Sequence, residues 1–507
     1  MITYSQACLD PHFFGPWFSG ESWTNWRVID KALFGEPLDA DELAIFRELT
    51  GRQEPPDEAT GEAWFIIGRR GGKDVKAASL AAYLATVGAE AYGWRKKLTR
   101  GERGVVQLLA VDKSQAGVAF AYASAMFDQP MLKKLIRKVT ADSIELKNGL
   151  AVEITTNDQR RVRGRTVVAA VFDEVAHWRN ENTVNPDEDV FQAVRPSMAT
   201  MPGAMLIGIS SPYARKGLLW RKYRENYGKP GKVLVVKAPT WRMNPTVPRD
   251  GEIIREAYES DPQSAAAEYG AEFRSDIESL LTLEAVQACV DIGTYERPPV
   301  QGQYVAFVDP SGGSSDSMTL AIGHKQPGKG QLAVLDVLRE AKPPFDPEAV
   351  VAEFAGVLKS YGIRFVYGDR FGGEWVKSAF RKAGMGYLSD PVPPKSQLYL
   401  DLVPLVNARQ CLLLDHSRLE RQLVDLERRT GRGTGRDVID HPPGGHDDVA
   451  NAVAGVFAAI GFHDRATVQE RKRPEWEEKG YVDMSKITYS DFHEILRRTK
   501  RAGADRI

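Results

Sequence analysis

The sequence predicts an α/β protein with two large domains, the first built around a parallel sheet and the second around a mixed sheet. Between Trp64 and Val236, short apolar runs alternate with helical stretches. Continuous apolar runs of this kind are typical of strands buried on both faces of a parallel sheet. After Gly302, three strands with short polar connections precede a helix, which is not the order of a doubly wound sheet. A chain of 507 residues is also too long for one core, because domains usually hold about 100–200 residues.

Composition and charge exclude several classes of protein. Lys and Arg number 67 against 68 Asp and Glu, a net charge of −1, which excludes a chain that is basic throughout but leaves room for local basic grooves. The three cysteines, Cys8, Cys289 and Cys411, are far apart, so neither a disulfide framework nor a CxxC-type zinc site is expected. No apolar run approaches the ~18 residues of a membrane span, and the amino terminus has no signal-peptide pattern. We therefore expect a cytosolic protein that is neither secreted nor membrane-bound.

Shifts in composition indicate the domain boundaries. Residues 1–275 form the first domain, with a helical lead-in over residues 1–60 that the loop signal Glu54-Pro55-Pro56-Asp57 closes. Residues 276–300 form a linker, residues 301–465 the second domain, and residues 466–507 a charged tail. The strands expected in the first domain are 64–67, 105–111, 167–172, 205–209 and 233–236. Those expected in the second are 304–308, 318–322, 332–337 and 364–367, with a helix over 347–360.

The first strand runs into a glycine-rich turn and then a helix. The turn reads Gly68-Arg69-Arg70-Gly71-Gly72-Lys73-Asp74, which is the layout of a phosphate-binding loop with its lysine. The strict pattern has Ser or Thr after the lysine, whereas this chain has Asp74, and the first glycine comes one position late. Asp74 can ligate magnesium through its carboxylate, and Arg69 and Arg70 can offset its charge. A glycine-rich turn with only a structural role is the alternative.

Asp173 and Glu174 follow the buried strand 167–172. A carboxylate at that point can hold the magnesium shell, and the next one can orient and deprotonate an attacking water. The alternative is an acidic cap on a helix that begins near Val175. Two such motifs about 100 residues apart, each at the carboxyl end of a strand, favour an ATPase.

Two further features near this strand allow more than one interpretation. Arg160, Arg161, Arg163 and Arg165 form a solvated face, supply an arginine finger to a neighbouring subunit, or contact a DNA backbone. Ser210 and Ser211, which follow the strand 205–209, sense the phosphate of a nucleotide or form only a turn.

The second domain carries acidic residues at three structural boundaries. Asp309 and Asp369 each end a strand, and the pair Asp447-Asp448 opens a helix. The element order is that of a ribonuclease-H-like sheet, in which the first and fourth strands are adjacent and parallel, so we expect Asp309 and Asp369 to meet. Two Mg²⁺ or Mn²⁺ ions roughly 3.5–4 Å apart can stabilise the attacking and leaving oxygens of phosphodiester hydrolysis. This ordered set predicts a two-metal nuclease, although each aspartate alone is more often a turn residue or a cap.

Other polar residues of this half remain ambiguous. Asp316 is explained equally well by a hairpin turn, and His446 orients a ligand or caps a helix. Lys395 and the arginines between 418 and 436 predict either a groove that follows a phosphate backbone or a solvated amphipathic helix.

In order and spacing, these motifs resemble the large terminase subunit of tailed bacteriophages over about residues 40 to 460. The residues that carry the resemblance are Gly68–Lys73, Arg163-Gly164, Phe172–Trp178, Ser210–Pro212, Asp309, Asp369 and His446–Asp448.

The resemblance implies a P-loop (RecA/ASCE-like) parallel-sheet ATPase domain followed by a ribonuclease-H-like mixed-sheet nuclease domain. It implies a motor that uses ATP and Mg²⁺ to drive double-stranded DNA into a procapsid and that cuts concatemeric DNA, with Mn²⁺ able to substitute in the nuclease site. The implied partners are DNA, the portal protein of the procapsid, a small terminase subunit and a ring of identical subunits, in the cytoplasm of an infected bacterium.

The resemblance also implies residue roles. Residues 68–74 bind the nucleotide with Lys73 on its phosphates, Asp173 serves magnesium, Glu174 activates water, Ser210 and Ser211 couple hydrolysis to movement, Arg163 is a trans-acting finger, Gln53 reads adenine, and Asp309, Asp369, Asp447 and Asp448 hold the nuclease metals. Two other functions stay open on the sequence: a repair or restriction-type nuclease without a capsid partner, and a structural subunit whose loop binds nucleotide without hydrolysing it.

Overall fold

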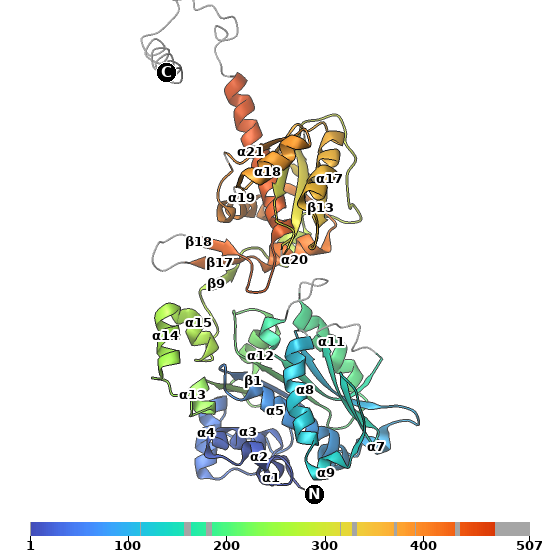
Figure 1. Cartoon of the computed structure of the whole chain (residues 1–507). Helices are drawn as coiled ribbons and strands as arrows, with labels where there is room; N and C mark the ends of the chain where they lie inside the picture. The colour runs from blue at the N-terminus through green and yellow to red at the C-terminus, as the bar shows by residue number, and fades with distance from the viewer. Residues whose placement is uncertain are drawn as a thin grey trace, which may run out of the picture. The chain divides into compact units, whose positions relative to one another are not determined.

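The structure, a computed structural model, describes residues 2–471 apart from 112, 157–163, 179–184, 315, 327–331, 370–372, 391 and 431–436. The chain divides into two compact units, drawn with their elements in Figure 1. The first comprises Met1–Gln287 and His416–Asp447, and the second Ala288–Asp415 and Asp448–Ile507. The sequence prediction places residues 416–447 in the second domain, whereas the structure groups them with the first unit. The predicted charged tail lies, beyond residue 471, outside the described residues.

The first unit is built on an eight-stranded sheet with the order β3-β4-β5-β2-β6-β7-β1-β8. The strands are β1 (Glu62–Ile67), β2 (Gly104–Ala110), β3 (Ile136–Val139), β4 (Ser143–Leu146), β5 (Leu150–Thr156), β6 (Thr166–Asp173), β7 (Met205–Ser210) and β8 (Val233–Ala238). All neighbours from β5 to β8 are parallel, and β3 and β4 add an antiparallel edge. The predicted parallel-sheet domain is therefore confirmed. One strand, β7, separates β1 from β6.

Helices cover both faces of this sheet. Alternate residues of each strand therefore pack in two separate cores, one on each face. Phe65 and Ile67 of β1 pack in one core with α5 (Lys73–Tyr83) and α8 (Lys113–Phe127). Trp64 and Ile66 pack in the other core with α11 (Pro186–Met198) and α12 (Gly217–Asn226). Figure 1 shows α5 and α8 lying along the sheet.

The lead-in consists of α1 (Tyr4–Leu9), α2 (Gly15–Phe18), η1 (Glu21–Trp23), α3 (Thr24–Leu33) and α4 (Ala40–Thr50). It packs onto α5 through a buried ion pair in which Lys76 Nζ lies 2.7 Å from Asp30 Oδ2. The Lys76 ammonium also lies 4.1 Å from the centre of the Phe18 ring. A buried charge is tolerated only when it is paired, so this contact joins the lead-in to the helix that follows the glycine-rich loop.

The rest of the first unit consists of short elements and a small antiparallel sheet. The helices are η2 (Leu84–Gly88), α6 (Ala89–Ala91), α7 (Trp94–Lys97), α9 (Pro130–Lys133), η3 (Val175–His177), α13 (Thr240–Met243), α14 (Glu252–Ser260), α15 (Pro262–Glu268), α16 (Leu283–Gln287) and α20 (Ser417–Asp425). The sheet has the order β18-β17-β9, with β9 (Ile277–Ser279), β17 (Glu427–Thr430) and β18 (Asp437–Asp440).

The second unit holds a seven-stranded sheet with the order β10-β16-β13-β12-β11-β14-β15. The strands are β10 (Val290–Asp291), β11 (Tyr304–Asp309), β12 (Met318–Lys325), β13 (Ala333–Ala341), β14 (Phe365–Gly368), β15 (Gly386–Leu388) and β16 (Cys411–Leu414). β11, β12 and β13 form an antiparallel meander, and β14 lies parallel beside β11. This is the predicted ribonuclease-H-like order, and the predicted pairing of the first and fourth strands is confirmed.

Helices also cover both faces of the second sheet. α17 (Pro347–Ser360), at the bounds predicted from the sequence, and α18 (Gly373–Lys382) pack on one face. α21 (Asp448–Arg471) packs on β11 and β12 and against α19 (Lys395–Asn407). A Cβ at Gly455 would lie 2.3 Å from Cγ of Phe307, so α21 approaches β11 closely. Of the helices in the described ranges, none combines the length and the apolar character that crossing a membrane requires.

Candidate nucleotide and metal sites

The glycine-rich loop lies between the carboxyl end of β1 and the first residue of α5, Lys73. Its backbone has two left-handed residues, Arg70 with φ of 64° and Gly72 with φ of 86°. A Cβ at Gly71 would lie 2.5 Å from Cγ2 of Ile67, so a side chain does not fit there. A loop with this curvature exposes backbone amides to a ligand at the start of a helix, where amides lack intrahelical acceptors.

Three successive carbonyls of the loop are held from outside it. The bonds run from Thr240 Oγ1 to Arg69 O (2.7 Å), from Asn244 Nδ2 to Arg70 O (3.0 Å) and from Trp26 Nε1 to Gly71 O (2.8 Å). With its carbonyls fixed in this way, the loop has a preorganised backbone. Sequence reasoning did not identify these three donors, because their residue types carry no motif.

Glu174 forms the centre of a polar group at the carboxyl edge of the sheet. Lys73, of which 5% is exposed, places Nζ 3.2 Å from Glu174 Oε1. The other oxygen, Oε2, accepts from Ser210 Oγ (3.0 Å) and from the Ser211 amide (3.2 Å). Burial opposes ionisation of Glu174, but the Lys73 charge and the Ser211 amide hold its pKa below the usual value.

The backbone of Glu174 is also in the left-handed region, with φ of 49°. Among the described residues, four that are not glycine have positive φ, and two of them, Arg70 and Glu174, lie at this edge of the sheet. Such conformations cost free energy and are concentrated at functional sites.

Asp173 and Asp74 add two carboxylates to this group. Asp173 Oδ1 is buried and accepts no hydrogen bond from the residues that the structure describes. Burial, with the neighbouring Glu174 and Asp74 charges, raises the pKa of Asp173 to about 8. Burial likewise raises the pKa of Asp74. Carboxylate oxygens are the ligands that Mg²⁺ prefers, so an unpaired buried oxygen among three carboxylates fits a divalent cation.

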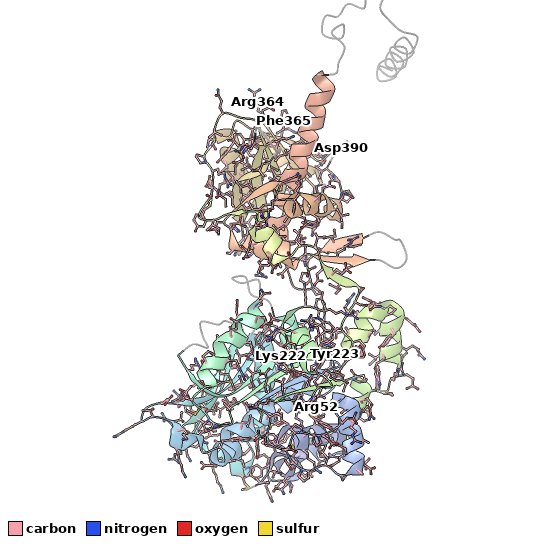
Figure 2. The ribbon with its side chains drawn as sticks, turned by 180° about the vertical axis from the view of Figure 1, so that it is seen from behind. Arg52, Lys222, Tyr223, Arg364, Phe365 and Asp390 are labelled. Carbon is pink, nitrogen blue, oxygen red and sulfur yellow. The ribbon has the colours of Figure 1, made fainter. Side chains whose placement is uncertain are left out.

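Gln53 is not brought to this site. The preceding Arg52, labelled in Figure 2, donates through Nη1 to Gly231 O at 3.2 Å and also to Val233 O. Val233 pairs with Glu62, the first residue of β1, so Gln53 lies near the amino end of that strand. The phosphate loop lies at the other end, about 20 Å away at 3.3 Å per residue. The predicted adenine contact of Gln53 is therefore not supported by the structure.

The predicted finger, Arg163, lies outside the described residues, as do Arg160 and Arg161. Arg165 is described, and it pairs with Glu153.

Asp309 and Asp369 lie side by side in the second unit. Val308 pairs with Gly368 in the parallel ladder, and the two aspartates are the next residues along each chain. Tyr387 donates to the carbonyl of Asp369 at 2.8 Å. Burial raises the pKa of the Tyr387 phenol, and the Asp369 and Asp309 charges raise it further. Both carboxylates therefore act on the same phenol, as the predicted meeting of the strand ends requires.

Asp448 reaches the same end of this sheet from the first turn of α21. Its Oδ2 accepts from the Ser317 amide at 3.3 Å, and its carbonyl accepts from Thr319 Oγ1 at 2.8 Å. Thr319 is the cross-strand partner of Asp309 on one side and of Glu340 on the other. Paired residues share a face of a sheet, so Glu340 belongs to the same row, where its Oε1 accepts from Ser317 Oγ at 2.7 Å. The sequence did not indicate Glu340, which lies near the end of a strand without a recognisable motif.

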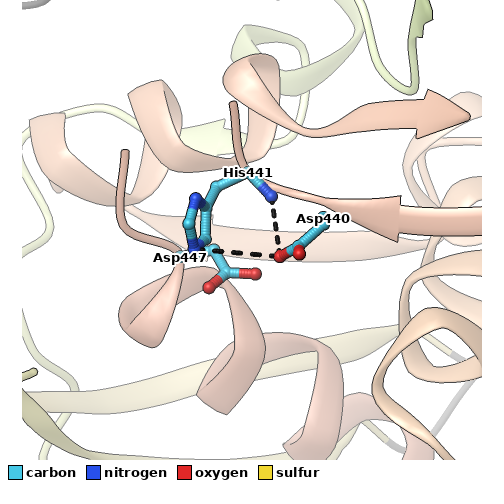
Figure 3. Close-up of side chains that lie close together, drawn as sticks. All are labelled: Asp440, His441 and Asp447. Atoms are coloured by element: carbon cyan, nitrogen blue, oxygen red, sulfur yellow. Dashed lines mark hydrogen bonds and ion pairs between the residues drawn. The ribbon is translucent and has the colours of Figure 1, made fainter. Parts of the chain in front are cut away.

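Asp447 belongs to the first unit, where it forms a group with Asp440 and His441 (Figure 3). One possible ligand atom from each residue lies within 4.8 Å of the others. His441 Nδ1 lies 2.9 Å from Pro442 O; since a carbonyl only accepts, Nδ1 donates there, and Nε2 lies 3.8 Å from Asp440 Oδ1. Two carboxylates and this nitrogen fit a divalent metal. Sequence reasoning missed Asp440 and His441, although a histidine at a strand end was a usable signal.

The remaining polar candidates have local roles. The carbonyl of Asp316 accepts from Ser311 Oγ at 2.6 Å within the connection between β11 and β12, and His446 is exposed. Arg421, of whose side chain 12% is exposed, pairs with Asp425 one turn along α20 at 3.3 Å.

The fold and these groups define a P-loop domain joined to a ribonuclease-H-like domain. Residues 38–271 match the family model described as "Uncharacterized protein MJ0330, N-terminal P-loop domain". No curated protein matches the sequence.

Several solved structures of phage large terminases are similar to the chain over most of its length, at low identity. The HK97 bacteriophage large terminase is 15% identical with a TM-score of 0.36, over 86% of this chain and 99% of that one. The large terminase of a thermophilic bacteriophage in complex with ATP-gamma-S is 12% identical with a TM-score of 0.31, over 78% and 93%. The large terminase nuclease from thermophilic phage G20c with bound magnesium is 18% identical with a TM-score of 0.30, over 36% and 96%.

Proposed function

We propose that the chain is the subunit of a viral genome-packaging motor that hydrolyses ATP to move double-stranded DNA into a procapsid and cleaves concatemeric DNA. One observation carries this proposal: a single chain holds both the Lys73–Glu174 pair beside a phosphate loop and the adjacent Asp309 and Asp369 on a ribonuclease-H-like sheet. An ATPase site and a cleavage site on one polypeptide suit a motor that must cut its DNA when packaging begins and when it ends.

In the first unit, Lys73 binds the phosphates of ATP, and Asp173 and Asp74 hold the magnesium shell. Magnesium neutralises the charge that develops on the phosphates. Glu174 orients the attacking water and takes its proton, a role supported by its lowered pKa, which keeps it ionised. Asp74 replaces the usual hydroxyl ligand, so we expect a magnesium shell with one more carboxylate than in a standard phosphate loop.

Ser210 and Ser211 hold one oxygen of Glu174 while Lys73 holds the other. A phosphate at Lys73 competes with Glu174 for the ammonium protons, so nucleotide binding and release change the hydrogen bonds at the end of β7. This exchange is how the serine pair would couple hydrolysis to movement. Arg163 of a neighbouring subunit in a ring would complete the site as a finger.

In the second unit, Asp309, Asp369 and Asp448 hold divalent ions against the scissile phosphodiester. The ions, Mg²⁺ or Mn²⁺, stabilise the attacking and leaving oxygens. The sheet fixes two of these carboxylates by strand pairing and the third by the Thr319 contact to α21. The partners of the whole motor would be DNA, the portal protein of a procapsid, a small terminase subunit and further copies of this chain.

A packaging assay tests this function. The chain is mixed with procapsids that carry a portal, linear DNA and ATP, and the DNA that survives DNase is measured. We expect protection that requires ATP and is absent with Lys73→Ala. Full ATPase and cleavage on DNA alone, without any response to procapsids, would instead indicate a repair or restriction-type nuclease. Nucleotide binding without turnover would indicate a structural subunit.

A further inference from the structure

A buried glutamate in the first unit has no part in the function proposed above. Glu427 of β17 has no exposed surface. Its Oε1 lies 3.1 Å from Lys216 Nζ, and its Oε2 accepts from the Tyr213 hydroxyl at 2.7 Å and from Arg429 Nη2 at 3.2 Å. Burying a carboxylate costs several kcal/mol unless it is paired, so this arrangement of a glutamate, two cations and a phenol is a specific junction.

One side of the junction is the segment that follows β7. Tyr213 comes two residues after Ser211, whose amide donates to Glu174 Oε2, and Pro212 lies between them. Proline fixes one backbone dihedral, which makes the connection from Ser211 to Tyr213 stiffer. The carbonyl of Tyr213 accepts from the Arg274 amide at 2.8 Å.

The other side of the junction is the β17–β18 hairpin. Glu427 is the cross-strand partner of Asp440, the last residue of β18. Arg429, which pairs with Glu427, also donates through Nη2 to the carbonyl of His441 at 3.3 Å. Asp440 and His441 are two of the three members of the metal-competent group that includes Asp447.

We propose that Glu427 is a positioning residue that ties the segment after β7 to the β17–β18 hairpin, so that the nucleotide state at Glu174 sets the position of Asp440 and His441. This inference rests on the proposed function, because it requires a nucleotide at Lys73. All of its contacts lie within the first unit.

Tyr213→Phe is the variant that tests the junction with least disturbance, since it removes one hydroxyl and keeps the ring. Glu427→Gln keeps the volume of the side chain and removes its charge. Tyr223→Phe is the matched tyrosine control: the ring of Tyr223, labelled in Figure 2, packs against Phe273 at 5.2 Å between centroids. Glu188→Gln, which loses an ion pair with Arg221 of 2.7 Å, is the matched control for the charge.

Amide hydrogen exchange with and without a non-hydrolysable ATP analogue tests whether the junction couples the glycine-rich loop to the hairpin. In the wild type and both controls, we expect the analogue to slow exchange in residues 68–74 and to change it in β9, β17 and β18. In Tyr213→Phe and Glu427→Gln, the change in residues 68–74 stays and the change in the three strands is lost. Protection of residues 68–74 without any change in the strands of the wild type would overturn the inference and leave the proposed function standing. Absence of protection in residues 68–74 would contradict both the inference and the proposed function.

Discussion

At the residue scale, the nucleotide site is a balance of charges around one ammonium. Lys73 faces Glu174 directly, and Asp173 and Asp74 are close enough for their charges to interact. The sequence located these four residues because each lies where a strand ends or a helix begins. It could not locate Thr240, since a side chain that binds a backbone carbonyl of a distant loop leaves no local pattern.

Glu174→Gln tests the proposed base. Glutamine keeps an oxygen that accepts from Ser210 and Ser211 but cannot take a proton, so we expect kcat for ATP to fall by about 10²–10⁴-fold with nucleotide affinity nearly unchanged. Lys73→Ala is expected to lose affinity as well. Steady-state hydrolysis and binding of a fluorescent nucleotide measure the two effects. Hydrolysis by Glu174→Gln at the rate of the Glu188→Gln control would show that another group activates the water.

Asp74→Asn tests the charge balance in the absence of metal. The pKa of Asp74 is raised in the folded state, and that of Asp173 is raised to about 8. Each carboxyl therefore destabilises the folded state as the pH rises above its unfolded pKa, and this cost disappears at acidic pH, where the folded and the unfolded protein both bind the proton. We expect Asp74→Asn in EDTA to unfold at a higher temperature than the wild type at pH 7.5, with a gain in unfolding free energy of about 1 kcal/mol. Near pH 3 we expect no such gain. A lower unfolding temperature at pH 7.5 would mean that Asp74 has a favourable partner.

At the scale of elements, the lead-in helices support the glycine-rich loop and the helix that follows it. α3 holds the loop through Trp26 and holds α5 through Asp30. Periodicity predicted five of the eight strands of the first sheet and four of the seven of the second, because buried strands have a clear apolar signature. It did not predict β3, β4, β5, β10, β15 or β16. The β9-β17-β18 sheet was missed because its strands are short, polar and widely separated in the chain.

Trp26→Phe removes one hydrogen bond from the phosphate loop and keeps an aromatic ring. A bond of this kind contributes about 1 kcal/mol, so we expect nucleotide affinity to fall about fivefold. Trp94→Phe is the matched control, because Trp94 Nε1 donates to the carbonyl of Pro202 at 2.7 Å, away from the loop. Equal affinities for the two variants in calorimetric titrations would exclude a role for Trp26 in shaping the loop.

Asp30→Asn tests the buried ion pair between α3 and α5. Removing one partner leaves the Lys76 ammonium buried without a counter-charge, so we expect the unfolding free energy of this unit to fall by about 3–5 kcal/mol. The double variant Asp30→Leu with Lys76→Met removes both charges, and we expect it to recover most of that loss. Urea unfolding followed by tryptophan fluorescence gives both values. A single variant as stable as the wild type would show that Lys76 is neutral in the folded protein.

At the scale of the whole molecule, the chain has a P-loop sheet in one unit and a ribonuclease-H-like sheet in the other, and we propose a different chemistry for each. The order of motifs predicted both folds and most candidate ligands, because strand ends and helix starts can be read locally. It did not predict that residues 416–447 belong to the first unit, since that depends on packing between segments far apart in the chain, such as the contact of Tyr213 with Glu427.

The most direct test of two sites on one chain measures ATP hydrolysis and Mg²⁺-dependent plasmid cleavage in the same preparations of wild type, Asp309→Asn and the control Asp401→Asn on α19. We expect Asp309→Asn to hydrolyse ATP at the wild-type rate and to have no cleavage above that seen in EDTA, with both activities intact in the control. Cleavage by Asp309→Asn at the rate of the wild type would contradict the account, because the cutting site would then lie elsewhere.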